Sequence, residues 1–378
     1  MTHRERIIAA LSHKQPDVVP IDLGGSRDSS IVVEGYEKLK KHFGIESENE
    51  LCDRMMQVVK VDERILRKLH IDTRSIFPGT PIKSAVQGIA PDKYRDAWGV
   101  DRIQPRGSYY YDQINYPLSG ERTISDILKY PWPDPSDPGY IKGLHKRAQW
   151  IKDNTECAAV LTVPAPFVHI TQYLRGFEDW YCDFVLNKGF IEALFDAVLE
   201  ITMEFARREL EEVGKEVDVV FCADDLGTQR SLQVNRSDYL KFIKPRHEKY
   251  FRQIHELSPA KLVFHSCGSV VDVIDDFIEI GVDVLNPVQV SAAGMNPAEL
   301  KKKYKSRLAF WGAMDNENIL PTGTVNDVKR MVEERIEQMG EGGGYVLSSC
   351  HNIQPDVPIE NILVMFEHAR QYVPSYMK

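Results

Sequence analysis

Residues 261–288, KLVFHSCGSVVDVIDDFIEIGVDVLNPV, contain the pattern that decides the fold. A β-branched apolar run at 261–268 is followed by a segment of helical periodicity at 268–281 and by a second β-branched run at 282–288. A strand, a helix and a strand in this order favour parallel pairing through a right-handed crossover. The unit is therefore typical of an α/β protein.

The same alternation recurs along the 378-residue chain. We predict eight strands, at 18–25, 73–77, 158–166, 217–227, 261–268, 282–288, 308–315 and 343–350. An amphipathic helix follows nearly every strand, and eight such units close into a (β/α)8, or TIM, barrel. An open doubly wound sheet would place a glycine-rich phosphate turn after the first strand, and LGGSRDSS at 23–30 is not one. We therefore expect a single barrel domain over residues 1–378.

The spacing between the second and third predicted strands is longer than a crossover needs. Residues 78–157 include the aromatic stretch GSYYYDQINYPLSG at 107–120 and the stiff PWPDPSDP at 131–138. We interpret residues 78–157 as an insertion that forms a lid over the mouth of the barrel.

Composition excludes several classes of protein. The net charge of −9 and the scattering of basic residues over several helices argue against a nucleic-acid partner. No run of about 18 apolar residues and no signal peptide are present, so we expect a cytoplasmic protein without a membrane segment. The six cysteines form no CxxC pair, so each is expected to be a thiol that packs or binds metal.

Three residues at two predicted strand ends suggest a metal site. His265 and Cys267 are two positions apart at the end of the fifth strand, so their side chains point the same way, and Cys350 ends the eighth strand. One imidazole and two thiolates suit zinc and leave a coordination position open, as catalytic zinc requires. Each residue taken alone is more often a packing residue than a ligand.

The His-x-Cys motif and the distant Cys resemble the zinc motif of the corrinoid-protein:coenzyme M methyltransferases, which belong to the uroporphyrinogen decarboxylase superfamily. Further segments similar to that superfamily are YPWPDP (130–135), APFVHITQYLRGFEDW (165–180), DDLGTQRSLQVNRSDYLKFIKP (224–245), FHSCGSV (264–270), WGAMDNENILPTGT (311–324) and SCHNIQPDVPIENI (349–362). The resemblance covers nearly the whole chain. It implies a zinc-dependent enzyme that moves a methyl group between a corrinoid and a thiol, or a similar acceptor such as tetrahydrofolate.

Comparison with the decarboxylase itself leaves that activity as an alternative. The resemblance places Gly79 where the decarboxylase has its essential Asp and Gln172 where it has a Tyr, and the arginine-rich segment after its first strand is reduced to Arg27. A non-catalytic barrel with a structural zinc is a third hypothesis. The cobalamin-binding motif DxHxxG does not occur, so the corrinoid is expected to arrive on a partner protein.

Three further residues are candidates for the site. Asp225 closes the fourth strand, and we expect it to orient a ligand or to accept a proton, the alternative being a helix N-cap. His351 follows Cys350 and is expected to face the other way, with a hydrogen bond within the pocket. Gln289 stands where the similar motif of cobalamin-independent methionine synthases has a Glu, so it is a weak candidate for the fourth ligand, and packing is the alternative.

Overall fold

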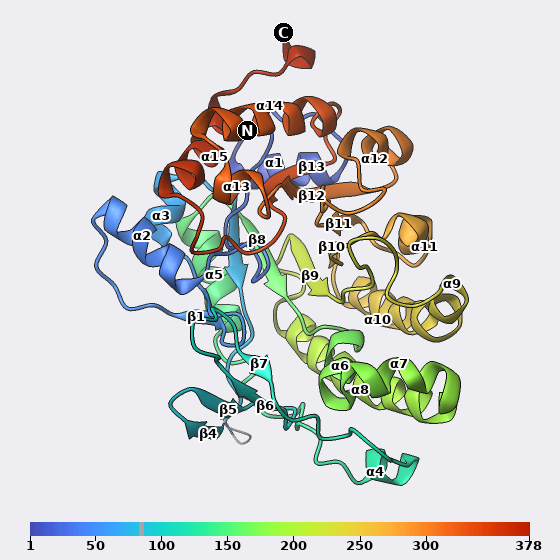
Figure 1. The fold of residues 1–378 in the computed structure, drawn as a ribbon. Coiled ribbons are helices and arrows are strands. Elements are labelled where there is room, and N and C mark those ends of the chain that lie inside the picture. Colours follow the sequence, from blue (N-terminus) through green and yellow to red (C-terminus); the bar gives the residue numbers. More distant parts are fainter. Residues whose placement is uncertain (83–86) are drawn as a thin grey trace.

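The computed structural model describes residues 1–82 and 87–378, and a curled parallel sheet of seven strands is its centre (Figure 1). The strands lie in the order β13-β12-β11-β10-β9-β8-β3, and every neighbouring pair is parallel. Their bounds are β3 (Thr73–Ile76), β8 (Ala158–Thr162), β9 (Val219–Ala223), β10 (Lys261–His265), β11 (Val284–Asn286), β12 (Ala309–Met314) and β13 (Tyr345–Ser349). Seven of the eight predicted strands are therefore confirmed.

The strand predicted at 18–25 is wrong, because this segment makes only one isolated parallel bridge, between Ile21 and Leu347. Leu347 N–H donates to the carbonyl of Pro20, and Asp72 N–H, just before β3, donates to the carbonyl of Ile21. Pro20 has no N–H to add to a ladder, and Gly24 turns the chain away with a φ of +74°. The segment thus lies between the two edge strands of the curled sheet without extending it.

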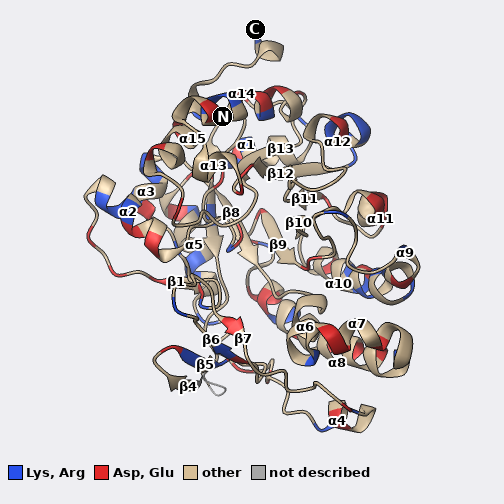
Figure 2. Cartoon of the chain, viewed as in Figure 1, with Lys and Arg blue, Asp and Glu red and all other residues tan. Residues whose placement is uncertain are grey.

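Helices surround the sheet in an arc, with both chain ends on the same side of the molecule (Figure 1). They are α1 (His3–Leu11), α2 (Val33–Phe43), α3 (Glu63–Lys68), α4 (Ile124–Leu128), α5 (Leu144–Asn154), α6 (Val168–Arg175), α7 (Phe177–Leu186), α8 (Lys188–Val213), α9 (Arg236–Asp238), η1 (Tyr239–Ile243), α10 (Lys244–Leu257), η2 (Val271–Val273), α11 (Ile274–Glu279), α12 (Pro297–Tyr304), α13 (Ile319–Thr322), α14 (Val325–Met339), α15 (Ile359–Gln371) and η3 (Ser375–Met377). Basic and acidic residues are interspersed over this layer (Figure 2). Among the described residues, no helix is long and apolar enough to cross a bilayer.

The core follows the two-residue period of the strands. In β8, Ala158 and Val160 face the inside of the curl, whereas Ala159 and Leu161 pack toward the helices. Helix α1 adds Ile7 and Leu11 to the inner cluster, and its backbone bonds to residues that precede β8 and β13. The apolar interior is therefore covered at the amino ends of the strands, and the polar residues gather at the carboxyl ends.

Residues 78–157 contain a small antiparallel sheet and a crossover helix. Strands β4 (Gln87–Ala90), β5 (Lys93–Arg95), β6 (Asp101–Ile103) and β7 (Asp112–Gln113) form an antiparallel sheet, while α5 packs on β3 and α8 as a crossover helix. A small antiparallel pair, β1 (Leu51–Asp53) and β2 (Val58–Val59), lies before them in the chain. Residues 83–86 of the predicted lid lie outside the described residues.

Candidate functional site

His265 ends β10, and Asn286 at the end of the neighbouring strand β11 holds its imidazole in one orientation. His265 Nδ1 lies 2.5 Å from Asn286 Oδ1, while Asn286 Nδ2 donates to the carbonyl of Trp311 and so fixes the amide. An amide oxygen only accepts, so Nδ1 carries the proton and Nε2 keeps its lone pair. This is the tautomer that a metal-binding imidazole needs when its other nitrogen donates to the protein.

Two other side chains meet His265 at the carboxyl end of the sheet. Cys267 Sγ lies 3.3 Å from His265 Nε2, so the two side chains meet as the His-x-Cys spacing predicts, although Cys267 lies two residues beyond the end of β10. The ring centroid of His351 lies 5.7 Å from that of His265. One nitrogen or sulfur atom from each of the three residues lies within 4.8 Å of the others, a spacing suited to a shared metal ion.

The expectation that His351 faces away from the site is therefore wrong. The alternation of side chains holds only while the backbone is extended, and β13 ends at Ser349. Cys350 and His351 lie in a bend beyond the strand, so both can turn toward the same space. The two residues line one cavity of 230 Å³ together with Cys267.

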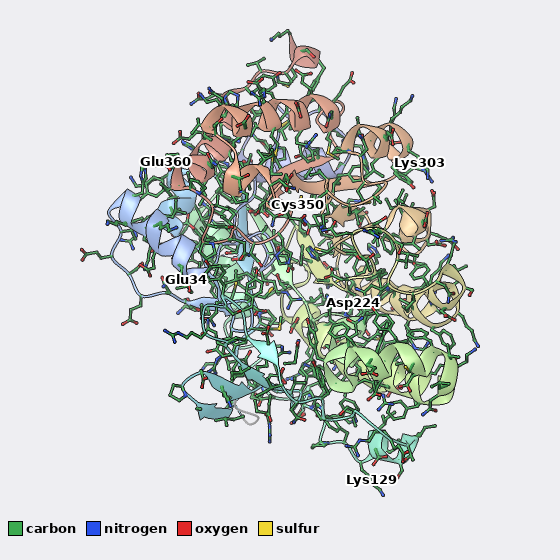
Figure 3. The ribbon with its side chains drawn as sticks, viewed as in Figure 1. Glu34, Lys129, Asp224, Lys303, Cys350 and Glu360 are labelled. Atoms are coloured by element: carbon green, nitrogen blue, oxygen red, sulfur yellow. The ribbon has the colours of Figure 1, made fainter. Side chains whose placement is uncertain are left out.

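Cys350 is close to this cluster but is not one of its three compact members. Its side chain is buried, and Sγ donates to the carbonyl of Val288 at 3.2 Å. Burial raises the pKa of Cys350 to about 12 and places the pKa of Cys267 well above its ordinary value. Both are neutral thiols unless a cation compensates their charge. Figure 3 shows Cys350 and Asp224 near the centre of the molecule, far from the peripheral Lys129 and Glu360.

Gln289 lies in the same cavity, but both ends of its amide are engaged. Its Oε1 accepts from Gly268 N–H at 2.6 Å, and its Nε2 donates to Glu317 Oε1 at 2.7 Å. Gln289 therefore supports the turn that follows Cys267. Glu317, an exposed carboxylate in the same cavity, was missed in the sequence, although its place three residues beyond β12 could have indicated it.

Asp225 contacts the cluster from β9. Its Oδ1 accepts from Cys267 N–H at 2.7 Å, and its Oδ2 lies 3.3 Å from His169 Nε2. Burial alone would raise the pKa of Asp225, but the nearby His169 and His265 and the Cys267 N–H outweigh it and hold the pKa well below its usual range. His169, which the sequence reasoning missed, lines the mouth cavity described below, next to Asp225. In the sequence, APFVHITQYLRG reads as an ordinary helical segment, so nothing in it marks His169 as a site residue.

A helix N-cap was the alternative role considered for Asp225. In the structure, its neighbour Asp224 has a capping role instead. Its side chain is fully buried and accepts hydrogen bonds from the N–H groups of Phe167, Val168 and His169, each at 3.0 Å. These are the first amides of α6, so the carboxylate sits at the positive end of that helix. Asp224 thus positions α6, and α6 carries His169 to Asp225.

A second cavity of 630 Å³ opens at the carboxyl end of the sheet and includes His265, Asp225 and His351 in its wall. Three arginines line this cavity. Arg102 Nε donates to Asp96 Oδ2 at 2.8 Å, Arg27 lies 3.5 Å from Asp28 and 3.8 Å from Asp53, and the exposed Arg54 lies over the Tyr94 ring, 4.1 Å from its centroid. Two of these three arginines thus already face protein carboxylates, which leaves Arg54, among the described arginines of this cavity, to pair with a substrate that bears many carboxylates.

The two positions compared with the decarboxylase have structural explanations. A Cβ at Gly79 would lie 2.2 Å from the carbonyl oxygen of Gly139, so a side chain cannot be accommodated unless the backbone moves. Gln172 is buried and donates to Gln233 Oε1 at 2.8 Å. Its neighbour Tyr173 lines the mouth cavity, and burial raises the pKa of that phenol to about 12.

Comparison with known proteins relates most of the chain to one family. A family model described as Uroporphyrinogen decarboxylase (URO-D) matches residues 110–372. Uroporphyrinogen decarboxylases from Legionella pneumophila strains Corby and Paris are 32% and 30% identical to this chain over 79 residues. These residues are 21% of this chain and 22% of either relative, so the match spans about a fifth of the length of these relatives. A methyltransferase from Methanosarcina mazei superimposes with a TM-score of 0.66 at 17% identity, over 98% of this chain and 99% of that one. This structural similarity shows a shared fold.

Proposed function

Because the chain belongs to the uroporphyrinogen decarboxylase (URO-D) family, we propose that it is a zinc-dependent methyltransferase that moves a methyl group between a corrinoid protein and a thiol or similar acceptor. The observation that carries the proposal is the pairing of His265 Nε2 with Cys267 Sγ at 3.3 Å, with Asn286 holding the imidazole in the tautomer that binds metal.

The donor set fits zinc. We assign His265, Cys267 and Cys350 as its ligands, because two thiolates and one imidazole match the softness of the ion and because both cysteines line one cavity. The chemistry that zinc supplies when bound is Lewis acidity, which lowers the pKa of an acceptor thiol so that it reacts as a thiolate. Gln289 is the weaker candidate for a fourth ligand, since its oxygen already accepts from Gly268 N–H.

The surrounding residues position and serve this centre. Asp225 fixes the backbone of Cys267, and His169 in turn holds Asp225. His351 lines both cavities, so its imidazole can accept the proton that an acceptor thiol releases. Asp225 and His351 are the catalytic candidates in this scheme.

The architecture around the site belongs to the same proposal. The segment at 18–25 is not a strand, but it closes the curled sheet into a barrel by joining the two edges, since it bonds to Leu347 of one edge strand and to Asp72 beside the other. The sheet inserted within residues 78–157 acts as a lid, because Tyr94, Trp98 and Tyr110 line the mouth cavity. The corrinoid arrives on a partner protein that docks at this mouth.

Decarboxylation of a tetrapyrrole is the second candidate, and the sequence identity to the Legionella enzymes favours it. The pairing of Arg27 and Arg102 with protein carboxylates and the steric exclusion of a side chain at Gly79 oppose it. A purely structural zinc is the third, and the two cavities that meet at His351 oppose it, because structural zinc sites are closed to ligands.

Methyl transfer from methylcobalamin to 2-mercaptoethanol, followed by the absorbance change of the corrinoid, tests the proposal. We expect transfer that stops when zinc is stripped, returns when zinc is added, and is absent in His265→Ala. Cys182→Ala is the matched control, because Cys182 is an exposed thiol. Transfer at full rate without zinc contradicts the proposal. Turnover of uroporphyrinogen by metal-free protein would assign the chain to the decarboxylase activity instead.

A further inference from the structure

Glu209 is a buried acid that the proposed chemistry does not use. It lies on α8, is 1% exposed, and yet lines the mouth cavity. Its Oε2 has no hydrogen-bond partner, and no ion pair involves this residue among the described side chains. Burial raises the pKa of Glu209 well above its ordinary value, and no neighbouring cation opposes that effect. An unpartnered carboxyl group is costly inside a protein, so its retention needs a reason.

The surroundings of Glu209 form a subsite. Phe205 lies one helical turn before it and packs edge-to-face on Tyr140, with ring centroids 4.4 Å apart. Thr162, at the end of β8, contributes a second buried oxygen without a partner, its hydroxyl Oγ1. All four residues line the same cavity as His265, so one ligand can reach from the cluster to this subsite.

We propose that this subsite binds a protonated amine of the small molecule that enters the cavity, pairing the ammonium group with the carboxylate of Glu209. Aromatic faces and a carboxylate together are the surroundings that an organic ammonium ion prefers. A ligand cation would also compensate the charge that the protein leaves without a partner. The inference rests on the proposed function in one respect, namely that the small molecule is the methyl donor or acceptor.

The pairing has a measurable consequence. Burial favours the neutral form of Glu209 in the empty cavity, and pairing with an ammonium group favours its ionised form, so binding of an already protonated amine should release protons. Burial places the pKa of the Tyr250 phenol, which feels the charge of Glu209, well above its ordinary value, so Tyr250 stays neutral at physiological pH. The other titratable groups of the cavity, His169, Asp225 and His351, lie at its cluster end.

Calorimetric titration with phenethylamine and with its neutral analogue 2-phenylethanol tests the inference. In buffers of different ionisation enthalpy, we expect protons to be released when phenethylamine binds and its affinity to rise with pH while the amine stays protonated. Glu209→Gln should abolish the proton release and weaken phenethylamine binding by about tenfold or more, while leaving the alcohol within about twofold. Glu212→Gln, an exposed acid on the same helix, is the matched control.

Phe205→Leu provides a second variant that keeps the acid and should weaken the amine more than the alcohol. Equal binding of the alcohol without proton release would show a neutral hydrogen-bonding subsite and overturn the inference, as would the absence of phenethylamine binding or an unchanged Glu209→Gln variant. Because these titrations need neither zinc nor turnover, they separate the two hypotheses. Amine binding without methyl transfer would reject only the proposed function, and methyl transfer without amine binding would reject only this inference.

Discussion

At the scale of single residues, the candidate metal site depends on which nitrogen and sulfur atoms are available to bind a metal ion. His265 binds Asn286 through Nδ1, so Nε2 is the nitrogen that faces Cys267. Cys350 and His351 are adjacent in sequence and both line the smaller cavity, but only His351 belongs to the compact cluster with His265 and Cys267. Cys350 and His351 are therefore the two candidates for the third ligand of the proposed zinc ion.

Alanine substitutions at Cys350 and His351 answer that question. We expect Cys267→Ala and Cys350→Ala each to lose about one zinc per chain, and His351→Ala to retain it, because two thiolates hold zinc more strongly than one thiolate with a second imidazole. Zinc content is measured by elemental analysis of the purified variants, with circular dichroism to show that each is folded. Cys52→Ala, Cys157→Ala, Cys182→Ala and Cys222→Ala serve as controls that keep the metal.

The opposite pattern, with zinc lost in His351→Ala and kept in Cys350→Ala, would replace our ligand assignment by His265, Cys267 and His351. Zinc retained in both Cys267→Ala and Cys350→Ala would refute a site at these strand ends.

At the scale of elements, the start of α6 links the fold to the site. The buried carboxylate of Asp224 accepts from three amides at this helix terminus, and its Oδ2 also lies 3.1 Å from His247 Nε2. Burial would raise the pKa of Asp224, but the contact with His247 and the helix amides outweigh it and lower the pKa below its usual value. The ionised form is therefore the one that the folded protein stabilises.

Substitution of Asp224 by Asn should lower the free energy of unfolding at pH 7 by about 1–3 kcal/mol, because an amide meets the helix amides with only one oxygen and no charge. A group with a lowered pKa stabilises the fold above its unfolded pKa of about 4 and loses that contribution as the pH falls. The difference between the wild type and Asp224→Asn should thus shrink below about pH 4. Denaturant titrations across this pH range measure it.

Asp196→Asn offers a comparison, because Asp196 is 58% exposed and pairs with Arg246 on the surface. A pH-independent difference for Asp224→Asn would show that its effect comes from packing and not from the charge at the helix terminus.

At the scale of the whole molecule, the two edges of the curled sheet are brought together by a segment that is not a strand. Asp22 is buried in this segment and accepts from Gly25 N–H, from the Thr73 hydroxyl beside one edge and from Trp311 Nε1, the last at 3.0 Å. One carboxylate therefore joins β3, β12 and the 18–25 segment, which are far apart in the sequence.

Removal of this carboxylate in Asp22→Ala should destabilise the protein by about 2–5 kcal/mol, because Trp311 and Thr73 lose a buried partner. The loss should loosen the closing segment first. We expect faster hydrogen exchange at the amides of Leu347 and Asp72, which donate to residues 20 and 21, than in the ladder between β9 and β10.

Hydrogen exchange read by mass spectrometry or by NMR can resolve these peptides. Uniform exchange over all strands would instead indicate that Asp22 stabilises the whole sheet and has no special role in joining its edges.

The sequence by itself determined the features that depend on local periodicity. Seven strand–helix units, the inner and outer faces of the strands and the meeting of His265 with Cys267 all follow from side-chain spacing along one segment, which the backbone reproduces wherever it is regular. Only the tertiary structure decided the rest. His351 turns toward the site because β13 has already ended. Residues 18–25 make one isolated bridge because their hydrogen-bond partners come from both edges of the sheet. His169, Glu317 and Glu209 line the two cavities although they are far apart in the sequence. No local pattern encodes such meetings, since they depend on where separate elements pack against one another.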